Sequence, residues 1–288
     1  MSETLKQSKF HRILFGEFHR NLKISDFDIG IFSTVTFLSL FGVVMIASVT
    51  IPLTDGSLSM TLNHIVKLIL AIFIGFLIFR VSLSTWKKID ISLIIFSFFL
   101  LTLVFFPLIG FEANGASRWI RILGFSFQPS ELMKFSLIIY ISSYCFRRMT
   151  EFKEKWLGFW KPVLVVISAI ALVLDEPDLG SSAVIFLISL TIMFIAGAPL
   201  KQMLIIFFMG LSVFISMILL VPWRMNRILS FVDPWSNYGE SGYQLSQALI
   251  AFSRGDLFGV GLGESLQKYH YLPDAQTDFI FAIIAEEL

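Results

Sequence analysis

Cysteine is almost absent from this sequence of 288 residues. The single cysteine, Cys145, lies inside an apolar run, so the chain can build neither an internal disulfide framework nor a cysteine-based zinc site. The four histidines lack the spacing of metal ligands, and a histidine-based zinc site is not expected either.

Charged residues are scarce too. Asp, Glu, Lys and Arg make up 15% of the chain, against about 25% in typical soluble domains. Apolar residues make up 56%, 32 phenylalanines among them, and the mean hydropathy is +0.80. This composition excludes an ordinary soluble domain and indicates a membrane protein. No nucleic acid is expected among its partners.

Several apolar runs are long enough to cross a membrane as helices. A spanning helix needs about 20 residues, and the first run is too long for the apolar part of a signal peptide. The stretch after Asp278, "FIFAIIAEEL", is too short to cross alone, so we expect it to begin an eighth span of a truncated chain. We therefore predict an all-α, polytopic transmembrane helix bundle. Its seven complete spans are Ile29–Ile51, Ile65–Phe79, Ile91–Ile109, Leu132–Phe146, Pro162–Leu174, Ser181–Ala198 and Met203–Val221.

Basic residues alternate between the two sides of these spans. Most of the 22 lysines and arginines fall in the N-terminal tail and in every second loop after it. Because loops rich in Lys and Arg stay inside, we predict a cytoplasmic tail at 1–28, followed by a single membrane domain at 29–288. The loops predicted to face outward are 52–64, 110–130, 175–180 and 222–277.

The last of these loops is unusually long. Connections of such length are generally functional or disordered, and its residues argue for order. Leu245, Leu249 and Phe252 follow the spacing of one helix face, which predicts an amphipathic helix at 242–259 on the membrane or on the spans. The glycines of "GVGLG" then favour a tight return, and they follow a helix rather than a strand, unlike those of a nucleotide-binding loop.

A first candidate site lies in "NGASRWIRILGFSFQPSELMK", residues 114–134. Arg118 and Arg121 belong to the loop, and a helix is expected to begin near Pro129. Glu131 and Lys134 share a face of that helix, which is typical of an ordinary i, i+3 ion pair. The three cations would equally suit an anionic headgroup such as phosphate or pyrophosphate, and both interpretations remain open.

A second candidate site is "DEPDLG", residues 175–180, with three carboxylates in four positions. Pro177 and Gly180 favour a turn whose acids cap the next helix. Alternatively, Asp175, Glu176 and Asp178 offer the oxygen ligands that Mg²⁺ or Mn²⁺ prefers. A divalent cation is therefore a candidate cofactor, and the sequence does not decide between the two interpretations.

Asp278 is the third candidate, because it stands where polar chain gives way to an apolar run. Such a carboxylate can cap the helix that follows, or it can act as a general base at the mouth of a cavity. Glu286 and Glu287 lie about two turns deeper, and we expect their partners to lie outside this sequence.

Taken in order, several stretches resemble the SEDS family of cell-wall polymerases. They are "NGASRWI", "QPSELMK", "EPDLG", "RILSFVDPW", "GYQLSQALIAFSRG" and "GVGLGESLQKYHYLPDAQTDFIFAIIAEEL". The resemblance runs from about Ile29 to Leu288. The residues of these stretches are more similar to those of the family's division member than to those of its elongation member.

The resemblance implies a ten-span peptidoglycan glycosyltransferase that polymerises lipid II in the bacterial inner membrane, at the division septum. It implies a class B penicillin-binding protein as the transpeptidase partner, together with other division proteins. The family's essential acid falls on Asp278, in a periplasmic loop, and its functional Glu and Lys fall on Glu131 and Lys134. Gln276 stands where the family usually has histidine, which puts in doubt any role for an imidazole there.

These residues suggest a mechanism. Asp278 would activate the acceptor sugar's 4-hydroxyl, while Arg118, Arg121, Lys134 and a divalent cation would hold the donor's pyrophosphate. Two other functions stay open: a lipid II flippase, because charged span ends also suit a transporter, and an elongation-type polymerase. A membrane scaffold for division proteins is a further alternative.

Overall fold

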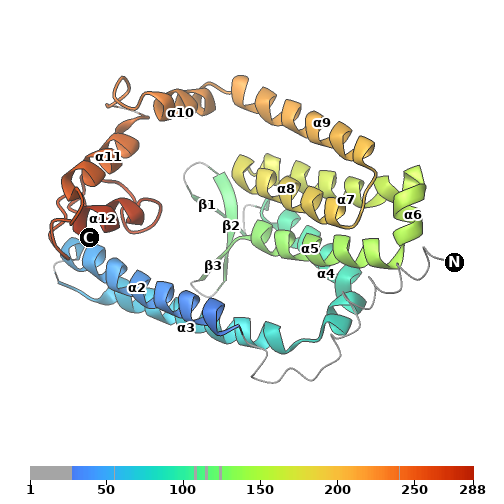
Figure 1. The fold of residues 1–288 in the computed structure, drawn as a ribbon, viewed down its shortest axis with the longest axis horizontal. Helices are drawn as coiled ribbons and strands as arrows, with labels where there is room; N and C mark the ends of the chain where they lie inside the picture. Colours follow the sequence, from blue (N-terminus) through green and yellow to red (C-terminus); the bar gives the residue numbers. More distant parts are fainter. Residues whose placement is uncertain (1–27, 55, 107–108, 114–115, 123–124, 240) are drawn as a thin grey trace. The chain divides into compact units, whose positions relative to one another are not determined.

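The computed structural model describes residues 28–288 except 55, 107–108, 114–115, 123–124 and 240 (Figure 1). The predicted cytoplasmic tail therefore lies outside the described residues, apart from Asp28. The chain divides into two compact units, which are described separately below. The first unit comprises Met1–Leu70 and Pro234–Leu288, and the second comprises Ala71–Asp233.

Helices occupy all seven predicted span positions, so the prediction of a transmembrane helix bundle is confirmed. Four of them, α2, α3, α7 and α9, are long and apolar enough to cross a membrane, and α8 is a shorter apolar helix. The seven helices are α2 (Ile29–Leu53), α3 (Ser59–Arg80), α4 (Leu83–Leu103), α5 (Pro129–Arg147), α7 (Trp156–Asp175), α8 (Leu179–Ile195) and α9 (Leu200–Leu219).

The boundaries of α4 differ from the prediction, which placed this span at 91–109. The helix begins earlier because the Ser82 hydroxyl accepts a hydrogen bond from the Thr85 amide at 3.3 Å and caps it. It also ends earlier, because the amides of Phe105 and Phe106 bond three residues back, to the Thr102 and Leu103 carbonyls, in turns that replace the helical pattern.

In the second unit, α4, α5, α7 and α8 pack around one apolar core. Leu101 of α4, Met133 and Ile141 of α5, Ala169 of α7 and Ile185 of α8 are each at most 1% exposed. Two shorter helices complete the helical part of this unit: α6 (Met149–Glu154), which packs against α7, and α10 (Pro222–Val232), which contacts α9.

A small antiparallel sheet departs locally from the all-α prediction. Strands β1 (Gly110–Ala113), β2 (Ala116–Ile122) and β3 (Phe125–Phe127) pair in the order β1-β2-β3. They occupy the loop predicted at 110–130, where the apolar alternation is too short to be recognised as a strand pattern. The β1–β2 register passes from Phe111↔Trp119 to Glu112↔Ser117, so Arg118 is an extra residue in β2. Such a bulge redirects side chains.

In the first unit, α2 and two helices that follow residue 234 share a second core. The predicted amphipathic helix is confirmed as α11 (Tyr243–Gly255), and α12 (Ile280–Glu287) packs against it. The face of α11 that is buried in the protein carries small residues, Ala248 and Ala251, whereas Leu249 and Phe252 of the predicted stripe are each 41% exposed. Contact of this stripe with the membrane stays a prediction. Small side chains face α12 because the two backbones approach closely. A Cβ on Gly255 would lie 1.9 Å from the Ala285 carbonyl oxygen.

This close approach makes Gly255→Ala a test of the α11–α12 packing. We expect the substitution to lower the free energy of unfolding by about 1–3 kcal/mol, because the added methyl group must push the two backbones apart. Gly42→Ala is the matched control, because a Cβ at this helical glycine of α2 meets no atom within 4 Å. Thermal melting in detergent measures the difference, and equal melting temperatures for the two variants would contradict the packing described here.

Candidate functional site

Asp278 lies two residues before α12, whose N-cap residue is Phe279. Its side chain is exposed, and the carboxylate makes no hydrogen bond or ion pair with any residue that the structure describes. Of the two interpretations of Asp278, the structure therefore gives no support to a capping hydrogen bond. It leaves an accessible, uncommitted carboxylate at this position, which a general base requires.

The chain leading to Asp278 has a defined local shape. The amides of Thr277 and Phe279 both bond to the Asp274 carbonyl, at 3.0 and 3.3 Å. Leu272 and Ala275 are each 2% exposed and pack into the core of the first unit. Asp278 is thus carried on an ordered turn whose apolar side chains are buried.

The start of the same segment is hydrogen-bonded to the C-terminal end of α12. The Val260 amide bonds to the Glu286 carbonyl at 2.9 Å, and the Gly261 amide bonds to the Glu287 carbonyl at 3.1 Å. The predicted tight return at "GVGLG" is confirmed, because Gly259 and Gly261 have φ of 64° and 110°, values that L-residues rarely adopt. A Cβ on Gly259 would also lie 2.4 Å from the Glu287 carbonyl oxygen.

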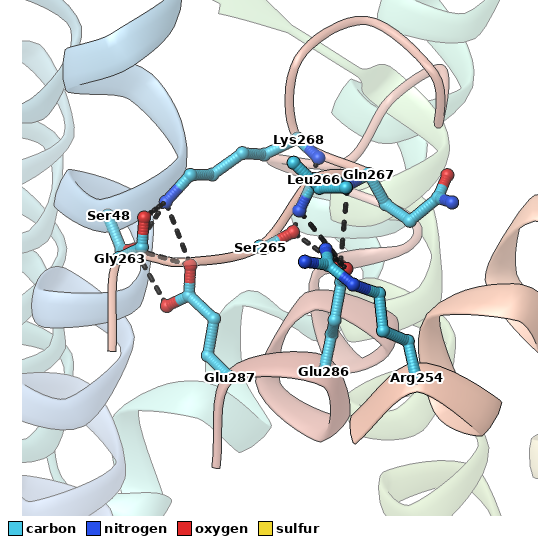
Figure 2. Close-up of polar contacts among 9 residues, drawn as sticks. All are labelled: Ser48, Arg254, Gly263, Ser265, Leu266, Gln267, Lys268, Glu286 and Glu287. Carbon is cyan, nitrogen blue, oxygen red and sulfur yellow. Dashed lines mark hydrogen bonds and ion pairs between the residues drawn. The ribbon is translucent and has the colours of Figure 1, made fainter. Parts of the chain in front are cut away.

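The side chain of Glu286 accepts hydrogen bonds from α11 and from the segment between α11 and α12 (Figure 2). Arg254 forms an ion pair with it at 2.7 Å, and the Ser265 hydroxyl donates at 2.5 Å. The backbone amides of Leu266 and Gln267 donate to it at 3.1 and 3.4 Å. The Glu286 side chain is fully buried, and four donors compensate for the loss of water around it.

The next acid, Glu287, forms a second buried set of contacts (Figure 2). Lys268 lies 2.9 Å from it, and neither side chain has any exposed surface. The Lys268 ammonium also donates to the Gly263 carbonyl at 2.5 Å. From α2, the Ser48 hydroxyl donates to the Glu287 carboxylate, lying 2.7 Å from one oxygen and 2.9 Å from the other.

The expectation that Glu286 and Glu287 find their partners outside this sequence is wrong. Both acids are paired within the first unit, by Arg254 and Lys268. Sequence analysis did not single out Lys268, because a lone lysine between a serine-containing turn and a tyrosine has no spacing that links it to a distant acid. The one available signal was a lysine in a segment predicted to face outward, followed 19 residues later by a glutamate in an apolar run.

In the second unit, the two candidate arginines of β2 have different surroundings. Arg118 donates through Nε to the Glu176 carbonyl at 2.9 Å and through Nη2 to the Pro177 carbonyl at 2.7 Å. It therefore joins the sheet to the turn at 175–180. Arg121 is exposed and lies over the ring of Phe111, 3.7 Å from its centroid. Of the two, Arg121 has the guanidinium more available to an anion.

The first turns of α5 contain the predicted ion pair. Pro129 occupies the first helical turn, as expected, and Lys134 Nζ lies 2.6 Å from Glu131 Oε1. The lysine side chain is 19% exposed and that of the glutamate 59%. The ion-pair interpretation is confirmed, and a role for Lys134 in binding an anion stays a prediction.

The turn at 175–180 combines a capping acid with an unpaired one. Asp178 accepts hydrogen bonds from the Ser181 amide at 2.9 Å and from the Gln128 side chain at 3.1 Å, so its capping role is confirmed. Glu176 is 1% exposed, and neither carboxylate oxygen has a hydrogen-bond partner. Burial, assisted by the charge of Asp178 and opposed by Arg118, raises the pKa of Glu176 to about 8.

No group of three or more His, Cys, Asp or Glu side chains in the described part of the chain is arranged to hold a metal ion. Asp175 is exposed, whereas Glu176 and Asp178 are buried, so the three acids of this turn differ in their surroundings. The predicted divalent-cation site at Asp175, Glu176 and Asp178 stays a prediction.

The raised pKa of Glu176 predicts a pH dependence of stability. Between its ordinary value of 4.5 and about 8, the folded state keeps a proton that the unfolded state releases. The free energy of unfolding therefore falls as the pH rises through this window, and it changes no further above it on account of Glu176. Glu176→Gln should flatten this slope in melting temperatures measured across the window. Asp175→Asn, an exposed acid beside it, should keep the parental slope, and equal slopes for the parent and Glu176→Gln would contradict the assignment.

Comparison with known proteins identifies relatives over nearly the whole chain. The probable peptidoglycan glycosyltransferase FtsW of Aliivibrio salmonicida is 43% identical over 255 residues, which are 87% of this chain and 63% of that protein. The protein of the same name from Saccharophagus degradans is 42% identical over 264 residues, 90% of this chain and 68% of its own length. The chain thus spans about two thirds of the length of these relatives.

Solved structures support the same fold. A variant of the Thermus thermophilus rod shape determining protein RodA is 26% identical, with a TM-score of 0.57 over 68% of this chain and 60% of that chain. A second structure, described as showing the structural coordination of polymerization and crosslinking by a peptidoglycan synthase complex, is similar in fold. Its TM-score is 0.68, with 24% identity, over 91% of this chain and 71% of that chain.

The family model described as cell cycle protein, which covers FtsW, RodA and SpoVE, matches residues 29–288. Its extent coincides with the chain from the start of α2 to the end of α12. The chain is therefore a multi-pass membrane protein that belongs to the FtsW/RodA/SpoVE family, the SEDS family whose motifs it resembles.

Proposed function

We propose that the protein is a peptidoglycan glycosyltransferase that polymerises lipid II into glycan strands during septal cell-wall synthesis. It would act in the bacterial cytoplasmic membrane, with a cytoplasmic N-terminus and with the segment 222–277 in the periplasm. Support comes from the family and from relatives named for this activity. The observation that carries the proposal is the exposed, unpaired carboxylate of Asp278 on a segment fastened to α12.

In the proposed reaction, Asp278 takes the proton from the 4-hydroxyl of the acceptor sugar as that oxygen attacks the anomeric carbon of the donor. The bond between this carbon and the lipid pyrophosphate breaks, with inversion of configuration. Pyrophosphate is a stable anion and needs little protonation to leave. The base and the stabilisation of the leaving group are therefore the two tasks for the protein.

The leaving group would be stabilised by the candidate cations of the second unit. Arg121 is exposed, and Lys134 keeps 19% of its side chain exposed beside Glu131. Arg118 uses Nε and Nη2 for backbone carbonyls, which leaves Nη1 for a phosphate oxygen. In this proposal Glu131 orients Lys134.

A class B penicillin-binding protein is the proposed partner, and it would crosslink the strands that this protein makes. The similar structure described as a peptidoglycan synthase complex joins polymerization with crosslinking, which supports such a pairing. Other division proteins are proposed to bring the pair to the septum.

Asp278→Asn tests the base assignment. We expect the purified protein carrying this change to polymerise lipid II about 10²–10⁴-fold more slowly, because the amide cannot accept the proton. Asp274→Asn is the matched control, since Asp274 is exposed, uses only its backbone carbonyl in the turn, and has φ of 54°, which asparagine tolerates. It should retain the parental rate. A parental rate for Asp278→Asn would exclude the base assignment.

The same assay separates the alternative functions. A lipid II flippase makes no polymer in detergent, so absence of polymer from the parental protein with its partner would favour transport. An elongation-type polymerase would make polymer but would be recruited along the side wall rather than at the septum in cells.

A divalent cation at Asp175, Glu176 and Asp178 is proposed as an aid to pyrophosphate binding, and it would replace the proton that Glu176 otherwise keeps at neutral pH. If it is required, chelation with EDTA should abolish polymerisation, and Mg²⁺ or Mn²⁺ should restore it. An undiminished rate in EDTA would remove the cation from the mechanism, and the capping role of Asp178 would then account for that acid.

A further inference from the structure

Lys268 is an unusual residue for an outer segment, because it is entirely buried. Its side chain has no exposed surface, and its ammonium contacts the Glu287 carboxylate, the Gly263 carbonyl and, at 3.4 Å, the Ser48 hydroxyl. All three acceptors belong to the protein. Lys268 therefore cannot bind a substrate phosphate without breaking its own contacts.

The contacts of Lys268 join three separate parts of the chain. Ser48 lies on α2, Lys268 and Gly263 lie in the outer segment, and Glu287 lies in the last turn of α12 (Figure 2). Removing one partner of a buried ion pair is strongly destabilising, because the other charge is left uncompensated away from water. The loss of Lys268 would therefore disturb the place where the segment between α11 and α12 meets the last turn of α12.

Asp278 stands at the opposite end of the same short helix. The segment leaves α11 after Gly255, is fastened to Glu286 and Glu287 between Val260 and Lys268, and then returns to enter α12 just after Asp278. The eight residues of α12 span about 12 Å. The segment therefore forms a closed loop together with α12. Its contacts with Glu286 and Glu287, at the C-terminal end of the helix, restrict the turn that carries Asp278 at the N-terminal end.

We infer that Lys268 is a positioning residue for Asp278: through its buried pair with Glu287 and its bond to Gly263, it holds the loop that presents the Asp278 carboxylate. This inference rests on the proposed function for the role of Asp278, whereas the fastening itself does not depend on any activity. Lys268 acts on geometry and contacts neither substrate nor leaving group.

Three variants of the purified protein test the inference, with lipid II as substrate. Lys268→Met removes the charge at similar length and leaves Glu287 unpaired. Lys268→Met combined with Glu287→Leu removes both charges, which buried sites commonly tolerate when apolar side chains fill the space. Lys67→Met is the matched control, because Lys67 lies in the first unit, is exposed, and makes no ion pair with the residues that the structure describes.

We expect Lys268→Met to lower kcat about 100-fold with KM little changed, since a displacement of about 1 Å costs that much. Hydrogen exchange of the amides at 260–279 should become faster in the same variant. The double variant should recover slow exchange and most of the rate, and Lys67→Met should match the parent in both measurements.

Two results would overturn the inference. One is a parental rate with parental exchange in Lys268→Met. The other is a double variant that regains slow exchange but stays as inactive as Lys268→Met, because a residue that acts only through position is rescued when the position is restored. If Lys268→Met fails to accumulate, the double variant is compared with the parent, and parental exchange without polymerisation overturns the inference.

Failure of the proposed function is distinguishable from these outcomes. If the parental protein makes no polymer, the glycosyltransferase proposal fails. The exchange rates of the three variants then still report whether Lys268 fastens the loop.

Discussion

A carboxylate that is buried away from water needs a cation and hydrogen-bond donors to compensate for its lost hydration. In the first unit two consecutive residues, Glu286 and Glu287, have this requirement. Glu286 and Glu287 are fully buried, and the cost of burying an unpaired ion is large. Four donors surround Glu286, and Lys268 and Ser48 satisfy Glu287. Most of these donors lie between Ser265 and Lys268, so the two acids hold this part of the segment between α11 and α12 in place.

The second unit meets the same requirement in another way at Glu176. This acid is buried without a hydrogen-bond partner, and its pKa rises to about 8, so it remains largely neutral at neutral pH. The nearby Arg118 donates hydrogen bonds to the carbonyls of Glu176 and Pro177 rather than to the Glu176 carboxylate. The first unit thus pairs its buried acids with basic side chains, whereas the second unit keeps the proton on a buried acid.

Local patterns in the sequence predicted those features that depend on nearby residues. The apolar runs predicted the seven helices, Pro129 predicted the start of α5, and the i, i+3 spacing predicted the Glu131–Lys134 pair. Contacts between distant segments could not be predicted in this way, because no spacing relates Ser48 to Glu287 or Lys268 to its acid. The apolar stripe predicted the helix α11, but it could not predict which residues face α12, because the close backbone approach at Gly255 selects the small residues Ala248 and Ala251 for that face.

The bond between Ser48 and Glu287 joins residues 239 positions apart, and this separation bears on the order of assembly. Helices of the second unit contact their neighbours along the chain and can pack while synthesis continues. The first unit cannot complete its packing at the same stage, because α2 is synthesised early and Glu287 is synthesised only after Ala71–Asp233. Until α12 is made, the face of α2 that carries Ser48 lacks its partner from that helix, so the packing of the first unit is completed after the helices of the second unit have been synthesised.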